Sequence, residues 1–120
     1  MSRDPRLFME DALAGCEKIL RYTRGFAFAE FQADEKTMDA VIRNLAVIGE
    51  AVKRLPQEIL SHYTAVDWRK IAGLRDVLIH NYFGTDDEIL WDVIQTKIPP
   101  LLQTLHRMLR EEAVRGEETS

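Results

Sequence analysis

The chain has 120 residues, of which 46% are hydrophobic, and its formal net charge is −4 at pH 7. This length accommodates one domain with an ordinary core and leaves little room for a second. The acidic balance argues against nucleic-acid binding over a broad basic surface, so a phosphate-binding site would have to be local. No apolar stretch approaches the roughly 18 residues of a transmembrane helix, and the N-terminal residues lack the apolar core of a signal peptide. We expect a cytoplasmic protein without a membrane partner.

The first helix is predicted over residues 5–24, because Asp4 followed by Pro5 is a start signal and Gly25 is a stop signal. Its apolar stripe consists of Leu7, Phe8, Ala12, Ile19 and Tyr22. Residues 26–31 form either a short helix or an irregular turn. The phenylalanines in this segment are more typical of core side chains than of a base-stacking platform.

The second long helix begins after Asp34, whose side chain can cap it, and ends at Pro56. Its apolar residues recur at three- and four-residue steps, which predicts one buried face. They are Met38, Val41, Ile42, Leu45, Ile48, Val52 and Leu55. The opposite face carries Arg43, Glu50 and Arg54 within about 40° of one another.

A central helix is predicted from Asp67, its cap, through Trp68 to Leu78. At about 100° per residue, His80 lies on the face of Asp76, while Arg75 and Tyr82 fall together about 140° away. Asp76 could therefore orient His80. Arg75 and His80 are about 7.5 Å apart along the axis and do not share a face. A compact site would need a second copy of this helix across a dimer axis.

Histidine and arginine together suit metal-free phosphodiester chemistry. Histidine has an unperturbed pKa near neutrality, so His80 can accept a proton and later return it. The guanidinium of Arg75 keeps its charge and fits phosphate oxygens. In RNA the neighbouring 2′-hydroxyl can serve as the nucleophile. The spacing alone also fits a different interpretation, in which His80 ends a core helix beside an ordinary surface arginine.

Glu50 is the second residue of interest, and two interpretations remain open. It could form a surface ion pair with Arg54 at the favourable four-residue spacing, which would contribute only tenths of a kcal/mol. Alternatively, it lies beside the central helix of its own subunit and pairs with Arg75 or orients His80.

The C-terminal third is also predicted to be helical. Residues 85–88 resemble a capping box, followed by a helix that carries Leu90, Trp91 and Ile94. Pro99 and Pro100 should kink or restart this helix, and the polar stretch from residue 111 should fray. The fold class is all-α, a four- to five-helix antiparallel bundle, with a single domain over residues 1–112 and a polar tail over 113–120.

Neither a metal nor a cofactor is predicted. His62, His80 and His106 have no close ligand spacing, and the chain has a single cysteine. Cys16 follows the apolar pattern of the first helix, so we interpret it as a small buried hydrophobe. There is no glycine-rich phosphate loop and no hydrolase nucleophile elbow.

Residues 68–82 contain the pattern Arg75, four residues, His80, one residue, Tyr82. This pattern closely resembles the signature of the HepT-like branch of the HEPN superfamily. The resemblance extends over nearly the whole chain, because residues 31–51, with the word Ile-Gly-Glu-Ala, and residues 86–102 resemble the helices that flank the signature. It implies a homodimeric, all-helical ribonuclease toxin of a type VII toxin–antitoxin system. The implied antitoxin is an MNT-type nucleotidyltransferase that uses ATP to AMPylate Tyr82.

The resemblance and the residue chemistry together predict a metal-independent endoribonuclease. Arg75 and His80 of both protomers would line a cleft at the dimer interface, with Asp76, Asn81 and Glu50 as supporting residues. Asp76 stands where many relatives have asparagine, so its role is the least defined. The main alternative is a non-catalytic helical module that binds nucleotide or presents a substrate to a nucleotidyltransferase. A purely structural bundle is a third class.

Overall fold

The computed structural model describes residues 4–74 and 87–119, and describes side chains as far as residue 113. Throughout this part of the chain the regular structure is helical, and it contains no strand. The all-α prediction is therefore confirmed. None of the described helices is long and apolar enough to cross a membrane.

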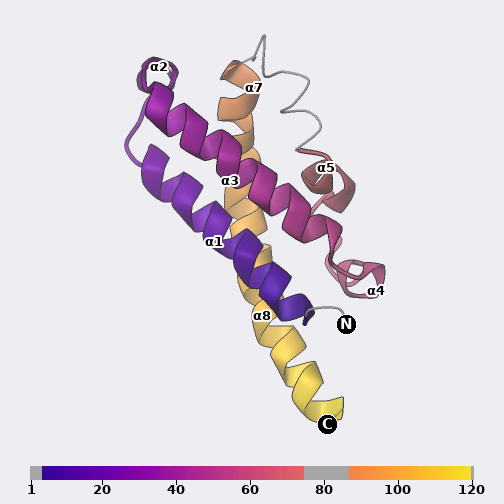
Figure 1. Cartoon of the computed structure of the whole chain (residues 1–120). Helices are drawn as coiled ribbons and strands as arrows, with labels where there is room; N and C mark the ends of the chain where they lie inside the picture. Colours follow the sequence, from indigo (N-terminus) through magenta and orange to yellow (C-terminus); the bar gives the residue numbers. More distant parts are fainter. Residues whose placement is uncertain (1–3, 75–86, 120) are drawn as a thin grey trace.

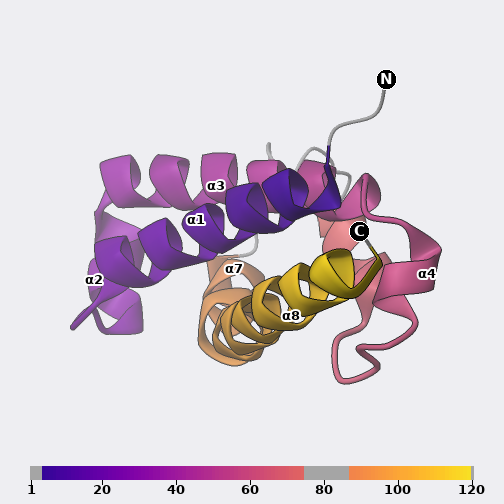
Figure 2. The same cartoon turned by 90° about the horizontal axis from the view of Figure 1, so that it is seen from below.

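Three long helical segments form the body of the molecule (Figures 1 and 2). Helix α1 (Pro5–Thr23) lies antiparallel beside α3 (Glu35–Lys53). The third segment starts with α7 (Asp87–Asp92), passes through a π-helical turn η1 (Val93–Lys97) and continues as α8 (Ile98–Thr119). It crosses behind the other two in Figure 1, and α8 packs against α1. Three short helices complete the described fold: α2 (Phe28–Ala33), α4 (Gln57–Leu60) and α5 (Trp68–Ala72).

The helix starts follow local capping chemistry. The side chains of Asp4, Asp34 and Asp67 accept hydrogen bonds from backbone amides of the first turn, at 2.9, 3.0 and 3.3 Å. Each bond satisfies an amide that has no partner inside the helix. Gly25 follows α1 with φ +79°, a conformation that L-residues with a side chain rarely adopt. These predicted boundaries are confirmed.

The core lies between the three long segments and includes one side chain from the short helix α2. Its fully buried members include Ile19, Phe31, Leu45, Ile48, Ile98, Leu101, Leu105 and Met108. The ring of Phe31 lies 5.3 Å from that of Trp91, and Phe28 lies 6.1 Å from the same ring. The segment after Gly25 is thus a short helix whose phenylalanines pack into the core.

The predicted apolar stripe of α1 is partly wrong. Leu7 and Tyr22 are 41% and 37% exposed, whereas Met9 and Cys16 are fully buried. The buried face follows the step Met9, Ala12, Cys16, Ile19. On the helical wheel Tyr22 lies about 100° from the centre of this face, and Leu7 lies about 160° from it, on nearly the opposite side. The Arg21 guanidinium lies 5.4 Å from the centre of the Tyr22 ring.

The helix predicted from Trp68 to Leu78 is interrupted at Gly73, and its residues 75–78 lie outside the described part of the chain. Helix α5 ends at Ala72, and Gly73 is its C-cap with φ −83° and ψ −1°. Glycine loses more conformational entropy in a helix than any other residue, which weakens the helix at this position. Gly73 keeps right-handed helical angles, and Leu74 is again helical.

Two consecutive prolines explain the π-helical turn η1. Pro99 and Pro100 have no N–H to donate, so an α-helical pattern through them cannot be completed. The Ile98 amide instead bonds to the Val93 carbonyl, five residues back. Thr96 Oγ1 donates to the Asp92 carbonyl at 2.8 Å. The helix restarts after this wider turn, as the prolines predicted.

Helix α8 extends to Thr119, beyond residue 111 where the sequence predicted fraying. Two contacts support its C-terminal half. Arg107 Nε donates to Glu111 at 2.8 Å, and the Tyr63 hydroxyl donates to Glu112 at 3.2 Å. The second contact joins α8 to the connector after α4, a pairing that local sequence patterns cannot reveal.

Candidate active site

The residues predicted to carry the chemistry belong to the segment between the described parts of the chain. Outside the described residues lie Arg75, Asp76, His80, Asn81 and Tyr82. Their predicted roles are therefore neither supported nor opposed by contacts. The structure instead defines the two ends of this segment, Leu74 and Asp87, and the helices that hold them.

The N-terminal end is held by α5. Ile71 is buried, and the indole Nε1–H of Trp68 donates to the Tyr63 carbonyl at 2.7 Å. Helix α5 packs against α3, the helix that carries Glu50. Leu74, one residue before Arg75, is half-buried.

The C-terminal end is held by α7. Leu90 and Ile94 are buried, and α7 contacts α2. The Gln32 amide lies 3.5 Å from an Asp87 carboxylate oxygen across this contact. The segment between Leu74 and Asp87, called the signature segment below, is consequently attached to the core at both ends.

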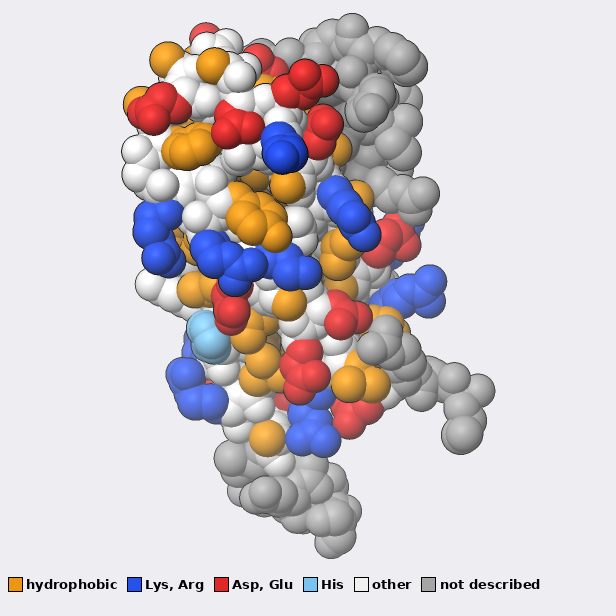
Figure 3. Space-filling model, turned by 60° about the vertical axis from the view of Figure 1, so that its left-hand side comes forward, with side chains coloured by type: hydrophobic (Ala, Val, Ile, Leu, Met, Phe, Trp, Pro, Cys, Tyr) orange, Lys and Arg blue, Asp and Glu red, His pale blue; other side chains and the backbone are white. Residues whose placement is uncertain are grey.

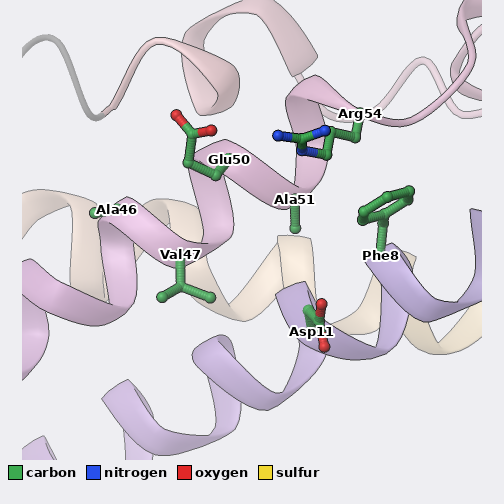
Figure 4. A pocket seen from close by; sticks show the side chains of 7 residues that line it. All are labelled: Phe8, Asp11, Ala46, Val47, Glu50, Ala51 and Arg54. Carbon is green, nitrogen blue, oxygen red and sulfur yellow. The ribbon is translucent and has the colours of Figure 1, made fainter. Parts of the chain in front are cut away.

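Glu50 is the predicted site residue whose surroundings are described. It is half-buried on α3 and lines a pocket of about 500 Å³ between α1 and α3. The pocket residues are Phe8, Asp11, Ala46, Val47, Glu50, Ala51 and Arg54. Figure 4 shows the side chains of Glu50 and Arg54 extending to the same side of α3, as the helical spacing predicted. Whether Glu50 supports the signature residues stays a prediction.

The basic residues of α5 do not form one surface. Arg69 and Lys70 are both exposed, but they line different pockets. Lys70 Nζ lies 4.0 Å from Asp67, an exposed pair that contributes little to stability. On the face drawn in Figure 3, basic side chains form a band with acidic side chains above and below it. This face is therefore no broad basic surface, in keeping with the net charge.

Cys16 is fully buried between the helices. Burial, together with the negative charge of Glu17, raises the pKa of its thiol to about 12. A thiol in this state is a weak nucleophile at neutral pH. The interpretation as a small buried hydrophobe is confirmed. Within the described residues, no group of three or more His, Cys, Asp or Glu side chains could hold a metal ion.

Sequence reasoning missed one pocket, which lies directly beside Leu74. It has a volume of about 620 Å³ and is bounded by α5 on one side and by α7, η1 and the start of α8 on the other. The consecutive prolines were a signal for irregular geometry there. They did not reveal that the irregular turn would face α5.

Comparison with known proteins identifies the class to which this helical fold belongs. The family model described as "Ribonuclease HepT-like" matches residues 12–108. The chain is 41% identical over 116 residues to a Methanocaldococcus jannaschii protein named "Putative RNase MJ0127", covering 97% of this chain and 94% of that protein. It is 41% identical over 101 residues to the "Probable ribonuclease HepT" of Thermococcus cleftensis, covering 84% of this chain and 92% of that protein. A similar comparison finds no matching solved structure.

The fold and these matches define a helical protein of the HEPN type. More narrowly, the chain belongs to the HepT-like ribonuclease family, because the family model covers most of its length. The predicted family is thus confirmed. The matched residues include the whole signature segment and both of the helices that hold its ends.

Proposed function

We propose that this protein is a metal-independent endoribonuclease that acts as a homodimer in the cytoplasm, as the toxin of a toxin–antitoxin pair. The observation that carries the proposal is the family match over residues 12–108, which includes Arg75, His80 and Tyr82 in the signature spacing. The names of the relatives, which include ribonuclease and RNase, support the same activity.

His80 is the proposed acid and base. It accepts the proton of a 2′-hydroxyl as that oxygen attacks the adjacent phosphorus, and it donates a proton to the departing 5′-oxygen. The products are a 2′,3′-cyclic phosphate and a 5′-hydroxyl. Arg75 stabilises the negative charge of the phosphorane, for which its planar fork of N–H donors is suited.

The dimer follows from the spacing of these two residues. Arg75 and His80 are separated by about 7.5 Å along a helix axis, so one helix presents them poorly to one phosphate. Two copies related by a twofold axis would place the arginine and histidine of both protomers around a shared cleft. Asp76 and Asn81 are proposed to orient His80, and Glu50 to support either His80 or Arg75.

Tyr82 is the proposed regulatory site. A partner nucleotidyltransferase would transfer AMP from ATP to the phenolic oxygen, with pyrophosphate as the leaving group. The adduct is bulky and anionic, so it would occupy the cleft and compete with RNA for Arg75. This mechanism silences the enzyme without unfolding it.

Induced expression of the chain alone tests the nuclease. The wild type should arrest growth, and the purified protein should cleave total RNA in the presence of EDTA. His80→Ala and Arg75→Ala should lose both effects while keeping the helical circular dichroism spectrum. His62→Ala and Arg69→Ala are matched controls because these exposed residues lie outside the signature. Toxicity that survives His80→Ala, or cleavage that requires an added metal, contradicts the proposal.

Mass spectrometry after co-expression with the neighbouring nucleotidyltransferase gene tests the modification. Tyr82 should gain the mass of AMP, and Tyr82→Phe should remain unmodified and toxic. A silenced complex with an unmodified Tyr82 would exclude this mode of regulation and leave the nuclease proposal standing.

A non-catalytic module is the second candidate, favoured by the net charge of −4, which is unusual for an RNA-binding protein. In that case the signature residues bind nucleotide or present a substrate to the nucleotidyltransferase. Harmless expression of the wild type, with tight binding to the nucleotidyltransferase, would favour it.

A further inference from the structure

The pocket beside Leu74 has two apolar walls. Its volume of about 620 Å³ is within the range of sites for small organic ligands. The apolar side chains come from the connector and α5 on one side and from the α7–α8 segment on the other. They are Val66, Ile71, Leu74, Ile89, Val93 and Pro100.

Ile89 gives this pocket an apolar surface that is exposed to water. Its side chain is 47% exposed, the highest value among the large exposed hydrophobic residues of the described chain. Ile71 on the opposite wall is buried, so the apolar surface extends from the core to the rim. A planar apolar group can therefore enter the pocket and cover surface that otherwise faces water.

Each wall also contributes one lysine, and Asp67, which lines the same pocket, lies 4.0 Å from the lysine of its wall. Lys70 comes from α5 and Lys97 from η1, and both side chains are exposed. The wider π-helical turn carries Val93, Thr96 and Lys97 into the pocket lining, and such turns occur often at functional sites. The lysines are 27 positions apart in the sequence, so the fold alone brings them to one pocket.

This arrangement matches one nucleotide within a strand. The base of such a nucleotide is a flat, largely apolar group, and a phosphate lies on each side of it. Two cations on two walls of an apolar pocket suit a nucleotide within a strand better than a free mononucleotide. The phosphates of a free mononucleotide all lie on one side of its base. The pocket also reaches Leu74, the residue before Arg75 in the signature.

We propose that the pocket between α5 and η1 binds a nucleobase of single-stranded RNA, with Lys70 and Lys97 contacting the two flanking phosphates. The bound nucleotide is then a near neighbour of the phosphate that is cut, which deepens the proposed ribonuclease function. The pocket holds the strand in register, and it favours single-stranded RNA because a base enters it only when unpaired.

Binding measurements test the pocket separately from cleavage. The probes are fluorescein-labelled nine-nucleotide RNAs of each base with 2′-O-methyl groups, which cannot be cut through the 2′-oxygen. Fluorescence anisotropy at several salt concentrations gives the dissociation constant and its salt dependence for the full-length protein.

Substitutions at Ile89 test the base contact. Ile89→Ala should weaken binding about fivefold, because it removes apolar contact with the base, and Ile89→Glu at least about tenfold, because it also places a negative charge beside the RNA strand. Leu7→Glu is the matched control because Leu7 is also an exposed apolar residue, 41% exposed, on a different helix. It should bind as the wild type does.

Substitutions at the lysines test the phosphate contacts. Lys70→Ala and Lys97→Ala should each weaken binding of all four RNAs alike and reduce the salt slope of log Kd by about 0.7, the value for one contact to a single strand. Lys36→Ala, an exposed lysine on α3, should leave the slope unchanged.

The outcomes separate the two proposals. RNA binding that is unaffected at Ile89, Lys70 and Lys97 overturns the pocket and leaves the nuclease to the test at His80. The expected binding pattern in a protein that cuts no RNA supports the pocket and contradicts the nuclease. AMP that competes as strongly as RNA identifies a free nucleotide as the ligand and overturns the proposal. A change in sedimentation with Ile89→Glu identifies an interface between copies, which also overturns it.

Discussion

Gly15 on α1 packs directly against the side chain of Ile48 on α3. A Cβ atom at Gly15 would lie 2.8 Å from Cγ1 of Ile48, a side chain that is fully buried. Real Cβ atoms do not tolerate such a contact, so the absence of a side chain at position 15 sets the distance between α1 and α3. Because α3 also packs against α5, this distance helps to position the start of the signature segment.

The first prediction concerns this contact. Gly15→Ala should lower the free energy of unfolding by about 1 kcal/mol, because overpacking costs roughly 1–3 kcal/mol and the gain in helix propensity offsets about 1. Urea denaturation at one fixed protein concentration measures the change. Ile48→Ala in the same chain should relieve the crowding, so the double variant should lose less than the sum of the two single losses. Additive losses would show that the contact does not limit helix packing.

The second prediction concerns the bond between Tyr63 and Glu112. Tyr63 is 2% exposed, and the Arg107 guanidinium lies 5.1 Å from the centre of its ring. Tyr63→Phe keeps the ring and removes the hydroxyl donor, so it should destabilise the protein by about 1 kcal/mol. Glu112→Gln keeps an oxygen acceptor and should change stability less. Equal stability of Tyr63→Phe and the wild type would mean that water replaces the bond at no cost.

The third prediction is a pH dependence caused by Cys16. Its thiol has a pKa of about 12 in the folded protein against 9.0 as the reference, so the folded state retains a proton that the unfolded state releases. Stability from this group is complete below pH 9 and falls as pH rises toward 12, by at most about 1.4 kcal/mol per pH unit. The loss of unfolding free energy above pH 9 should be smaller in Cys16→Ala than in the wild type. Parallel pH profiles for the two proteins would contradict the assignment.

The fourth prediction concerns Glu50 as a positioning residue of the proposed nuclease. Glu50→Gln should lower kcat for RNA cleavage about tenfold, which corresponds to about 1.4 kcal/mol of the activation barrier. It should also shift the pH profile of the rate, because a carboxylate near His80 favours the protonated imidazole. Arg54→Gln, on the same side of α3, is the matched control and should retain the profile. A loss of stability without a shifted profile would assign Glu50 a structural role alone.

Local chemistry made much of this fold predictable. The capping bonds of Asp4, Asp34 and Asp67 join groups two or three residues apart, so their residue types are sufficient to predict the helix starts. The stop at Gly25 and the restart at Ile98, directly before Pro99, follow from backbone restrictions of single residues. The signature of Arg75 and His80 was also readable from spacing, and the family match supports its identification.

Periodicity was less reliable at the edges of helical faces. Tyr22 fits a helical stripe in sequence, yet it is exposed, because the stripe does not reveal which edge of it a neighbouring helix covers. Leu7 was assigned to this stripe although it lies about 160° from the centre of the buried face, and it is exposed as well. The end of α5 at Gly73 was likewise not predicted, since a single glycine within an apolar pattern is compatible with either a continuous or an interrupted helix.

The sequence by itself determined the helical class, the helix starts and the family, since these depend on short-range chemistry and on a motif with fixed spacing. Tertiary structure alone decided the contact of Gly15 with Ile48, the bond of Tyr63 to Glu112 and the pocket shared by Lys70 and Lys97. Each of these joins residues more than 25 positions apart. Such contacts depend on the rotation and crossing of whole helices, and those are set by the packing of the complete core.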